Sequence, residues 1–261
     1  MDPVFIDDPK GELAIWYEPD PSLRYAMGVD SSEGIRGGDY AVAYVIESQT
    51  MKMCARWRGL IDANQWALCC CLLGYAYNEA FICFETGGSA HGLTAANNAM
   101  LLGYPNLYRR IHQDQVQRQE TKKLGYRTDV RTRPMLFNRV RVALEEEYEI
   151  NCPILLHEAR GIKLNEKGQI VHEDHDDTVI AYALTLEARD AGYTSGIFEA
   201  PTSVERLTDE DRMWDEWEAE DKAAEELVFG VNRRLRRHNG SGEEGEEGEE
   251  GVQRGRGFRR K

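Results

Sequence analysis

The chain reads Tyr25-Ala26-Met27-Gly28-Val29-Asp30 and, further on, Ala80-Phe81-Ile82-Cys83-Phe84-Glu85, so two short apolar runs each end on a carboxylate. Apolar runs of this length are typical of buried strands. A third acidic cluster, Asp174-His175-Asp176-Asp177, precedes an apolar stretch from Thr178 to Leu186 whose spacing fits a buried helix. The sequence therefore places acids at two strand ends and at the start of one helix.

This distribution of acids is the one that a site for two divalent metal ions needs. Mg²⁺ and Mn²⁺ prefer oxygen ligands, and two such ions roughly 3.5–4 Å apart can hold the attacking and the leaving oxygen of a phosphodiester. Each acid also has a purely structural interpretation: Asp30 could end a strand, Glu85 could open the loop at 86–88, and Asp176 or Asp177 could be a helix N-cap. The joint pattern favours the metal site and, with it, phosphoryl hydrolysis.

Size and composition predict one main domain. With 261 residues and 41% hydrophobic residues, the chain can bury one core of ordinary size. It has no run of about 18 apolar residues, and its N-terminus lacks the basic and apolar regions of a secretory signal, so we expect no membrane association and a cytosolic location. The six cysteines form no Cys-x-x-Cys pair, so we expect reduced thiols and no zinc site.

The order of the expected elements indicates an α/β fold. We expect strands at 25–30, 40–47 and 51–57 in an antiparallel meander, a helix at 66–77 with Asp62 as N-cap, a strand at 80–84, a helix at 91–102, a strand at 107–110, a helix at 134–148 and a β-hairpin at 162–171. The helical crossover makes the strand at 80–84 parallel to its neighbour; if that neighbour is the strand at 25–30, Asp30 and Glu85 end side by side. The expected fold is therefore ribonuclease H-like. It has a mixed sheet of three antiparallel strands plus parallel strands, helices that flank the sheet, and an additional β-hairpin.

Changes in composition set the expected boundaries along the chain. Prolines and polar residues in 1–24 predict a lead-in or linker, 25–195 is the expected ribonuclease H-like domain, 196–240 an acidic helical segment, and 241–261 a disordered tail of Glu/Gly and then Arg/Gly sequence. The acidic segment and the basic tail are either contact surfaces or solvated spacers.

The net charge of −14 argues against a polyanion as partner, but the distribution of charge reverses that interpretation. Between Arg109 and Arg141 the chain has ten basic residues and three acids. Such a stretch is typical of a footprint on a phosphate backbone; the alternative is a solvated helix face whose arginines pair with acids elsewhere. The candidates for contact with DNA in this stretch are Arg109, Arg110, Lys122, Lys123, Arg127, Arg131 and Arg133.

Four motifs resemble those of a known family. They are Gly103-Tyr-Pro-Asn-Leu-Tyr-Arg-Arg110, Leu124-Gly-Tyr-Arg-Thr128, Thr132-Arg-Pro134 and His175-Asp-Asp-Thr-Val-Ile-Ala-Tyr-Ala-Leu184. In order and spacing they are similar to the nuclease domain of the large terminase subunit of tailed bacteriophages, across the region from Tyr25 to Arg189. The His-Asp-Asp followed by an apolar helix is the most specific of them.

The resemblance implies an endodeoxyribonuclease that cuts concatemeric double-stranded viral DNA during genome packaging, with two Mg²⁺ or Mn²⁺ ions and little sequence specificity. Asp30 would bridge both ions, and Glu85 matches the second acidic position. Asp176 and Asp177 match the paired aspartates of the third, with Asp177 favoured as the obligate ligand and Asp176 supporting it. Asp174 stands three residues before Asp177, on the same helical face if the turn has begun there, so it could be an outer ligand.

Further residues take auxiliary roles under the same resemblance. His175 and His172 are candidates for orienting a water or shielding the metals, although each could equally be a surface histidine without a role. The hairpin at 162–171 matches a family feature thought to steer DNA at the site, so its Lys163 and Lys167 join the candidate DNA-binding residues.

The resemblance also implies partners and a place of action. These are the portal, the small terminase subunit and an ATPase motor, met in the host-cell cytoplasm and transiently at the procapsid portal, and not in the virion. The chain has no Gly-x-x-x-x-Gly-Lys-[Ser/Thr] phosphate loop. We therefore expect a nuclease fragment or a split subunit, monomeric in isolation, that cuts DNA without translocating it.

Other functions stay open. A 3′ exonuclease of the DEDD type would use His172, five residues before Asp177, but it needs Asp-x-Glu in the first strand, whereas Glu33 stands three residues after Asp30. Holliday-junction resolvases share the acidic geometry but lack the Gly-Tyr-Pro block. A non-catalytic module could instead dock a packaging machine on a portal or small subunit through its acidic segment and basic tail.

Overall fold

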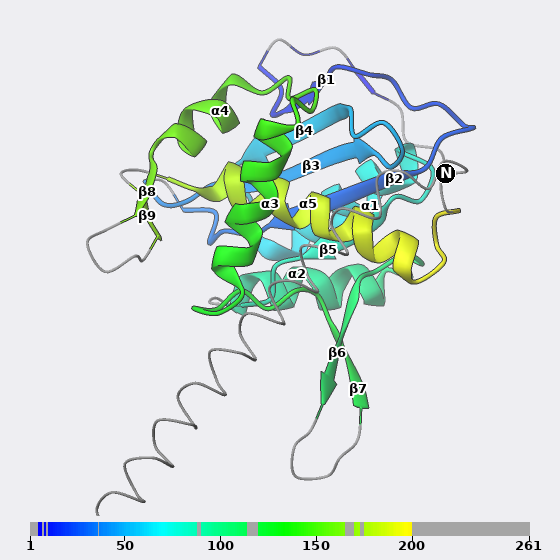
Figure 1. The fold of residues 1–261 in the computed structure, drawn as a ribbon. Helices are drawn as coiled ribbons and strands as arrows, with labels where there is room; N and C mark the ends of the chain where they lie inside the picture. Colours follow the sequence, from blue (N-terminus) through cyan, green and yellow to red (C-terminus); the bar gives the residue numbers. More distant parts are fainter. Residues whose placement is uncertain are drawn as a thin grey trace, which may run out of the picture. The chain divides into compact units, whose positions relative to one another are not determined.

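The computed structural model describes residues 5–6, 8, 10–35, 37–87, 90–113, 120–164, 170–172 and 175–199, shown in Figure 1. Of the predicted acidic segment at 196–240, residues 200–240 lie outside the described residues, as does the whole predicted tail at 241–261, and the boundaries of both segments stay predictions. Within the described part of the chain, none of the helices is long and apolar enough to cross a membrane.

A five-stranded mixed sheet forms the centre of the fold, in the order β1-β4-β3-β2-β5. The strands are β1 (Leu13–Ile15), β2 (Tyr25–Asp30), β3 (Ala41–Glu47), β4 (Met53–Gly59) and β5 (Phe81–Phe84). The β2-β3-β4 meander is antiparallel, and β5 runs parallel to β2, as the sequence predicts. The ribonuclease H-like class is therefore confirmed in its sheet.

The sheet also recruits a strand from the segment that we expected to be a lead-in. β1 pairs antiparallel with β4, with Leu13 opposite Trp57 and Ile15 opposite Ala55. Its residues begin the short apolar run Leu13-Ala14-Ile15-Trp16-Tyr17, which lies among the prolines and polar residues of the expected lead-in. The exposed edge of β4 supplies the hydrogen-bond partners that turn this segment into a strand, and the sheet begins before the expected boundary at Tyr25.

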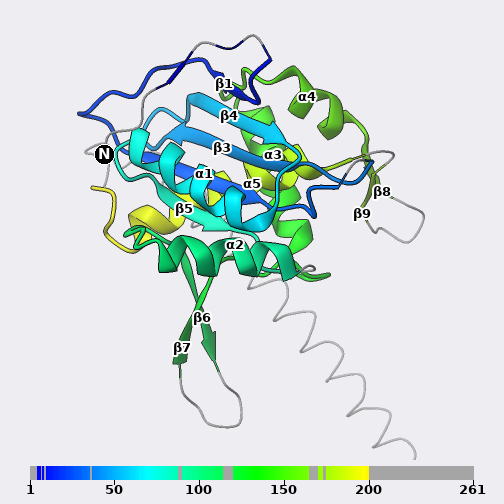
Figure 2. The same cartoon turned by 180° about the vertical axis from the view of Figure 1, so that it is seen from behind.

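Helices cover both faces of the sheet. Figure 1 looks onto the face with α3 (Arg133–Glu145), α4 (Pro153–Arg160) and α5 (Asp177–Thr194), and Figure 2 onto the face with α1 (Ala63–Ala76) and α2 (Ala90–Leu101). Alternation along β2 divides the core accordingly, because successive side chains of a strand point to opposite faces. Ala26 belongs to the core under α5, whereas Met27 and Val29 belong to the core under α1 and α2.

Helix α5 crosses β2 at unusually close range. The amide of Gly28 donates to Oγ1 of Thr185 at 3.1 Å. A Cβ atom at position 28 would lie 2.1 Å from the backbone nitrogen of Thr185 and 2.4 Å from the carbonyl oxygen of Ala181. Only glycine allows this approach, so Gly28 sets the height of α5 above the sheet.

Two hairpins extend the fold beyond the sheet. The predicted hairpin at 162–171 is present as β8 (Ile162–Leu164) paired with β9 (Ile170–His172). The strand expected at 107–110 differs: Leu107 makes one parallel bridge to Ile82, and the chain then leaves the sheet as β6 (Arg109–Gln113), which pairs with β7 (Glu120–Leu124). Both views show the β6–β7 hairpin projecting away from the sheet.

Helix α1 begins where the sequence places its cap. Oδ1 of Asp62 accepts hydrogen bonds from the backbone nitrogens of Asn64 at 3.0 Å and Gln65 at 3.3 Å. We expect Asp62→Ala to lower the free energy of unfolding by about 1 kcal/mol, because two helix amides lose their acceptor. Urea denaturation measures the change. The exposed Gln65→Ala on the same helix is the control, and an equal loss in both proteins would contradict a capping role.

Candidate functional site

Two carboxylates meet at one edge of the sheet. Asp30 is the last residue of β2, and Glu85 directly follows β5. The two strands are parallel, with Val29 opposite Phe84, so both strands end at this edge. The backbone amide of Glu85 donates a hydrogen bond to the carbonyl of Val29 at 2.9 Å. By alternation, Asp30 lies on the face of Ala26 and Gly28, which is the face that α5 covers.

The N-terminus of α5 brings two further acids to the same edge. Burial raises the pKa of Asp30 well above its usual range, and the carboxylates of Glu85, Asp177 and Asp176 raise it further through their negative charge, with a hydrogen bond to Glu85 acting in the same direction. Three acids from two other parts of the chain are therefore close enough to Asp30 for their negative charges to act on it.

Asp177 is held by backbone as well as by its surroundings. It is buried, and its Oδ2 accepts a hydrogen bond from the backbone nitrogen of Tyr40 at 2.9 Å. Burial raises the pKa of Asp177 to about 6, and the charges of Asp39 and Glu158 add to that rise. The Tyr40 hydrogen bond and the charge of His175 oppose it, because both favour the ionised carboxylate.

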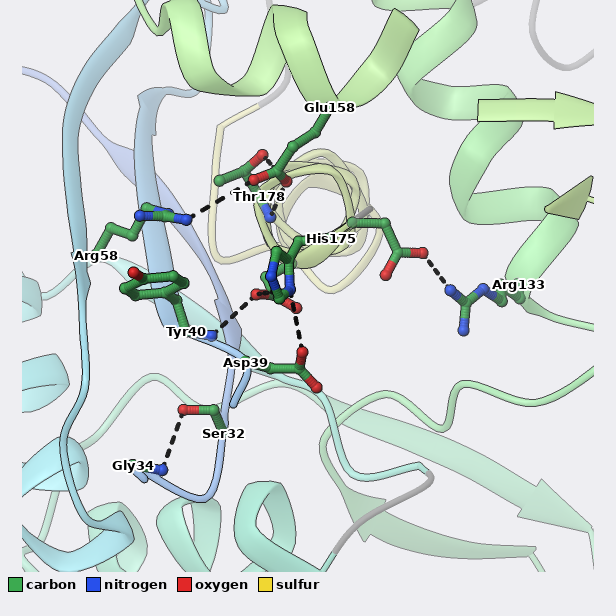
Figure 3. A network of polar contacts seen from close by, with 11 residues as sticks. Ser32, Gly34, Asp39, Tyr40, Arg58, Arg133, Glu158, His175 and Thr178 are labelled. Atoms are coloured by element: carbon green, nitrogen blue, oxygen red, sulfur yellow. Dashed lines mark hydrogen bonds and ion pairs between the residues drawn. The ribbon is translucent and has the colours of Figure 1, made fainter. Parts of the chain in front are cut away.

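Asp176 differs from Asp177 in having a cationic partner. Its carboxylate forms an ion pair with the guanidinium of Arg133, which comes from the start of α3 (Figure 3). Arg133 also lies over the ring of Phe137, with 5.5 Å between its Cζ and the ring centroid. Part of the negative charge of Asp176 is therefore already balanced by protein.

One acid of the site was not predicted. Nδ1 of His175 lies 3.2 Å from Oδ1 of Asp39 and 3.8 Å from Oδ2 of Asp177. The ligand atoms of these three residues all lie within 4.8 Å of one another, so they could hold a metal ion (Figure 3). Asp39 precedes β3, and the pairing of Asp30 with Val42 brings that loop to the site. An acid placed just before the second strand of a meander is the signal that could have identified it.

A second unpredicted acid, Glu158 of α4, caps α5. Asp176 occupies the N-cap position of α5, but its side chain makes no capping hydrogen bond. Instead, Oε2 of Glu158 accepts from the backbone nitrogen of Thr178 at 3.0 Å and also from the Thr178 hydroxyl. The interpretation of Asp176 as the N-cap is therefore confirmed for its position, but the capping hydrogen bond comes from Glu158 and not from the Asp176 side chain.

The predicted basic residues that the structure describes comprise two half-buried ones and six exposed ones. Arg110 is half-buried, and its Nη1 donates to Oγ1 of Thr86 and to the carbonyl of Gly125, both at 2.9 Å, so it fixes the loop after β5. Arg133 pairs with Asp176. The exposed residues are Arg109, Lys122, Lys123, Arg127, Arg131 and Lys163. Asp174, Lys167 and the side chain of His172 lie outside the described part of the chain.

The chain is similar in structure to solved proteins, although the comparisons with family models and with curated proteins found no match. The large terminase nuclease from thermophilic phage G20c with bound magnesium matches with a TM-score of 0.54 over 69% of this chain and 89% of that chain, at 17% identity. The same nuclease with bound cobalt gives 0.54 at 18% identity, covering 69% and 89%.

A third match comes from a different phage. The Thermus phage P74-26 large terminase nuclease domain matches with a TM-score of 0.52 at 18% identity, covering 68% of this chain and 86% of that chain. At these identities the likeness concerns the fold. The chain therefore has the fold of large terminase nucleases, and the resemblance found in its motifs is confirmed at that level.

Proposed function

We propose that this chain is a metal-dependent endodeoxyribonuclease that cuts concatemeric double-stranded viral DNA during genome packaging. The observation that carries the proposal is the convergence of Asp30, Glu85 and Asp177 at one sheet edge in a fold shared with large terminase nucleases. Two strand ends and one helix start supply these carboxylates, and clustered carboxylates are the ligands that two-metal phosphodiester hydrolysis uses.

The donor set fits two divalent cations such as Mg²⁺ or Mn²⁺. All the acids at the edge offer hard oxygen ligands, and their mutual repulsion at Asp30 is the kind of charge excess that a bound cation relieves. Asp30, Glu85 and Asp177 would hold the ions, with Asp176 supporting them from its pair with Arg133. When bound, the ions would lower the pKa of a water and stabilise charge on the phosphate.

The protein's own groups position this centre. The Tyr40 amide fixes one oxygen of Asp177 at 2.9 Å. His175 and Asp39 lie beside that oxygen, where they are suited to orient a water or to contribute a ligand. His175 thus keeps its auxiliary role in the proposal, now together with Asp39.

Exposed basic residues would bind the phosphate backbone of the substrate. Arg109, Lys122 and Lys123 lie on the β6–β7 hairpin, and Lys163 lies on β8. Contacts of this kind follow the backbone and carry no sequence information, so cleavage should tolerate any sequence and weaken with salt. In a packaging assembly, the ATPase motor, the portal and the small subunit in the host cytoplasm would supply translocation and recognition.

Incubation of supercoiled plasmid with the purified chain tests the proposal. In Mn²⁺ or Mg²⁺ we expect conversion to nicked, linear and then degraded DNA, and in EDTA we expect intact plasmid, because the clustered carboxylates need the cation to bind phosphate. Asp30→Asn protein purified in the same way controls for contaminating nucleases.

Two outcomes would contradict the proposal in different ways. Intact plasmid with every divalent metal, together with retained DNA or portal binding, would favour the docking module. Release of mononucleotides from 3′ ends without nicking of closed circles would favour the exonuclease.

A further inference from the structure

The start of α5 is capped by a side chain from another helix, so the acids beside it do not have to supply the cap. A helix leaves its first amides without intrahelical partners, and an Asp at the N-cap usually accepts from them. Here Asp176 stands at that position without capping, and Glu158, twenty residues before Thr178, accepts from both the amide and the hydroxyl of Thr178. Asp176 and Asp177 can therefore direct their carboxylates elsewhere.

Glu158 is itself a costly residue to bury. Only 6% of its side chain is exposed, and a buried carboxylate destabilises a fold unless hydrogen bonds and opposite charge compensate. Thr178 supplies the hydrogen bonds, the partial positive charge of the helix N-terminus is favourable, and Nη2 of Arg58 lies 4.0 Å from Oε1. These three interactions together indicate that the fold holds the Glu158 carboxylate in a defined position.

The same arginine connects the cap to the other support of Asp177. The guanidinium of Arg58 lies over the ring of Tyr40, with 3.5 Å from Cζ to the ring centroid. Tyr40 is the residue whose amide donates to Oδ2 of Asp177. The contacts thus form a closed circuit from Asp177 through Tyr40, Arg58 and Glu158 to Thr178, the next residue after Asp177 in the chain (Figure 3).

We propose that Glu158 is a positioning residue for the metal centre, acting through its cap on Thr178 and its pair with Arg58 to hold Asp177 in place. The inference rests on the proposed function, because it gives Asp177 the role of ligand. It adds that metal affinity depends on a carboxylate that touches neither metal nor substrate. Loss of such an outer partner typically costs about 10- to 100-fold in metal affinity.

Direct binding of Mn²⁺ to the full chain, measured by loss of the free-ion signal in electron paramagnetic resonance, tests the inference without requiring cleavage. We expect Glu158→Ala to weaken Mn²⁺ binding by about 10-fold or more, and Glu158→Gln, which keeps an acceptor for Thr178, to weaken it less. In plasmid cleavage, the metal concentration for half-maximal rate should rise for Glu158→Ala while the rate at saturating metal recovers.

Leu155→Ala is the matched control for stability. Leu155 is fully buried on the same helix and lies outside the circuit, so its truncation destabilises α4 without touching the cap. Thermal melting followed by circular dichroism compares the stability of the two variants. Should Glu158→Ala fail to fold, Thr178→Val, which removes one of the two hydrogen bonds to Glu158 at nearly constant volume, takes its place with the same expected direction.

The possible results distinguish a positioning role of Glu158 from a general effect on stability. Weaker Mn²⁺ binding by Glu158→Ala but not by Leu155→Ala supports the positioning role. Equal weakening in both, or none in Glu158→Ala, overturns it, because the effect would then be one of stability or absent. A wild-type chain that neither binds Mn²⁺ nor cuts plasmid contradicts the proposed function itself, and this result is read without any variant.

Discussion

Asp30→Asn is expected to fold normally and to cut plasmid DNA at least about 1,000-fold more slowly than the wild-type chain, a loss of roughly 4 kcal/mol in transition-state stabilisation. Asparagine keeps the shape of the side chain but removes the charge at the point where Glu85, Asp176 and Asp177 converge. A neutral amide binds hard cations far less well than a carboxylate does. Rates of nicking in Mn²⁺ at equal protein concentration measure the effect.

Stability should move in the opposite direction in the same protein. The pKa of Asp30 is raised in the folded state, so the carboxyl group at this position costs stability as the pH rises above its unfolded pKa, and this cost is present at neutral pH. Asparagine removes it, so without metal the variant should melt at a temperature equal to or above that of the wild type. An Asp30→Asn protein that melts at or above the wild-type temperature but does not cut DNA would show that its inactivity is not caused by misfolding.

Asp62→Asn is the matched control, since it makes the same chemical change at an exposed N-cap where asparagine caps equally well. We expect this protein to cut at the wild-type rate. If Asp30→Asn retained a tenth or more of the wild-type rate, Asp30 would not be a metal ligand, and the site would have to be sought around Asp39 and His175.

Gly28→Ala is expected to destabilise the fold by about 3 kcal/mol or more. The added Cβ would lie 2.1 Å from the backbone nitrogen of Thr185, 2.4 Å from the carbonyl oxygen of Ala181 and 2.6 Å from the carbonyl carbon of Leu184. All three are main-chain atoms of α5, so no side chain can turn aside, and the helix must lift from β2. The hydrogen bond from the Gly28 amide to Thr185 would be lost with it.

Because α5 carries Asp177, the same shift should also reduce cleavage by the molecules that remain folded. Urea denaturation measures the stability, and plasmid nicking at a temperature well below the transition measures the activity. Gly196→Ala is the control: its positive φ of +74° makes alanine strained, but no atom lies within 4 Å of the new Cβ, so we expect a loss of only about 1–2 kcal/mol. Equal losses in both proteins would contradict the close crossing.

The elements that hold the site were predictable because they carry their own patterns. β2 and β5 are continuous apolar runs that end on acids, and α5 is an apolar stretch that begins on one. Asp62 identified the start of α1 through its capping chemistry. The parallel pairing of β2 and β5 followed from the helix between them.

Elements defined by their neighbours were not predictable. β1 is a strand because the edge of β4 pairs with it, and α4 is a helix of eight residues whose periodicity is too short to recognise. Leu107 makes a single bridge to Ile82 of the sheet, and the chain then continues into the β6–β7 hairpin. The apolar pattern at 107–110 could not distinguish a strand of the central sheet from a strand of a hairpin.

The residues of the site likewise divide into those that their own sequence pattern identifies and those that only their neighbours in the fold identify. Asp30, Glu85 and Asp177 sit at element ends, where sequence patterns are informative. Asp39 reaches His175 across 136 residues of sequence, and Glu158 reaches Thr178 from a different helix, so only the packed fold reveals them. Charge counts likewise could not tell that Arg110 and Arg133 already have partners within the protein.

The crossing of α5 over β2 has a consequence for the timing of synthesis. The carboxylates of residues 30 and 85 leave the ribosome long before the helix at 177–194 that completes their surroundings. Until α5 has been synthesised, the nascent chain holds Asp30, Asp39 and Glu85 beside a face of the sheet that α5 does not yet cover, without Asp176 and Asp177. We therefore expect the proposed DNA-cutting centre to stay inactive in nascent chains until the helix at 177–194 has been made and has packed on β2.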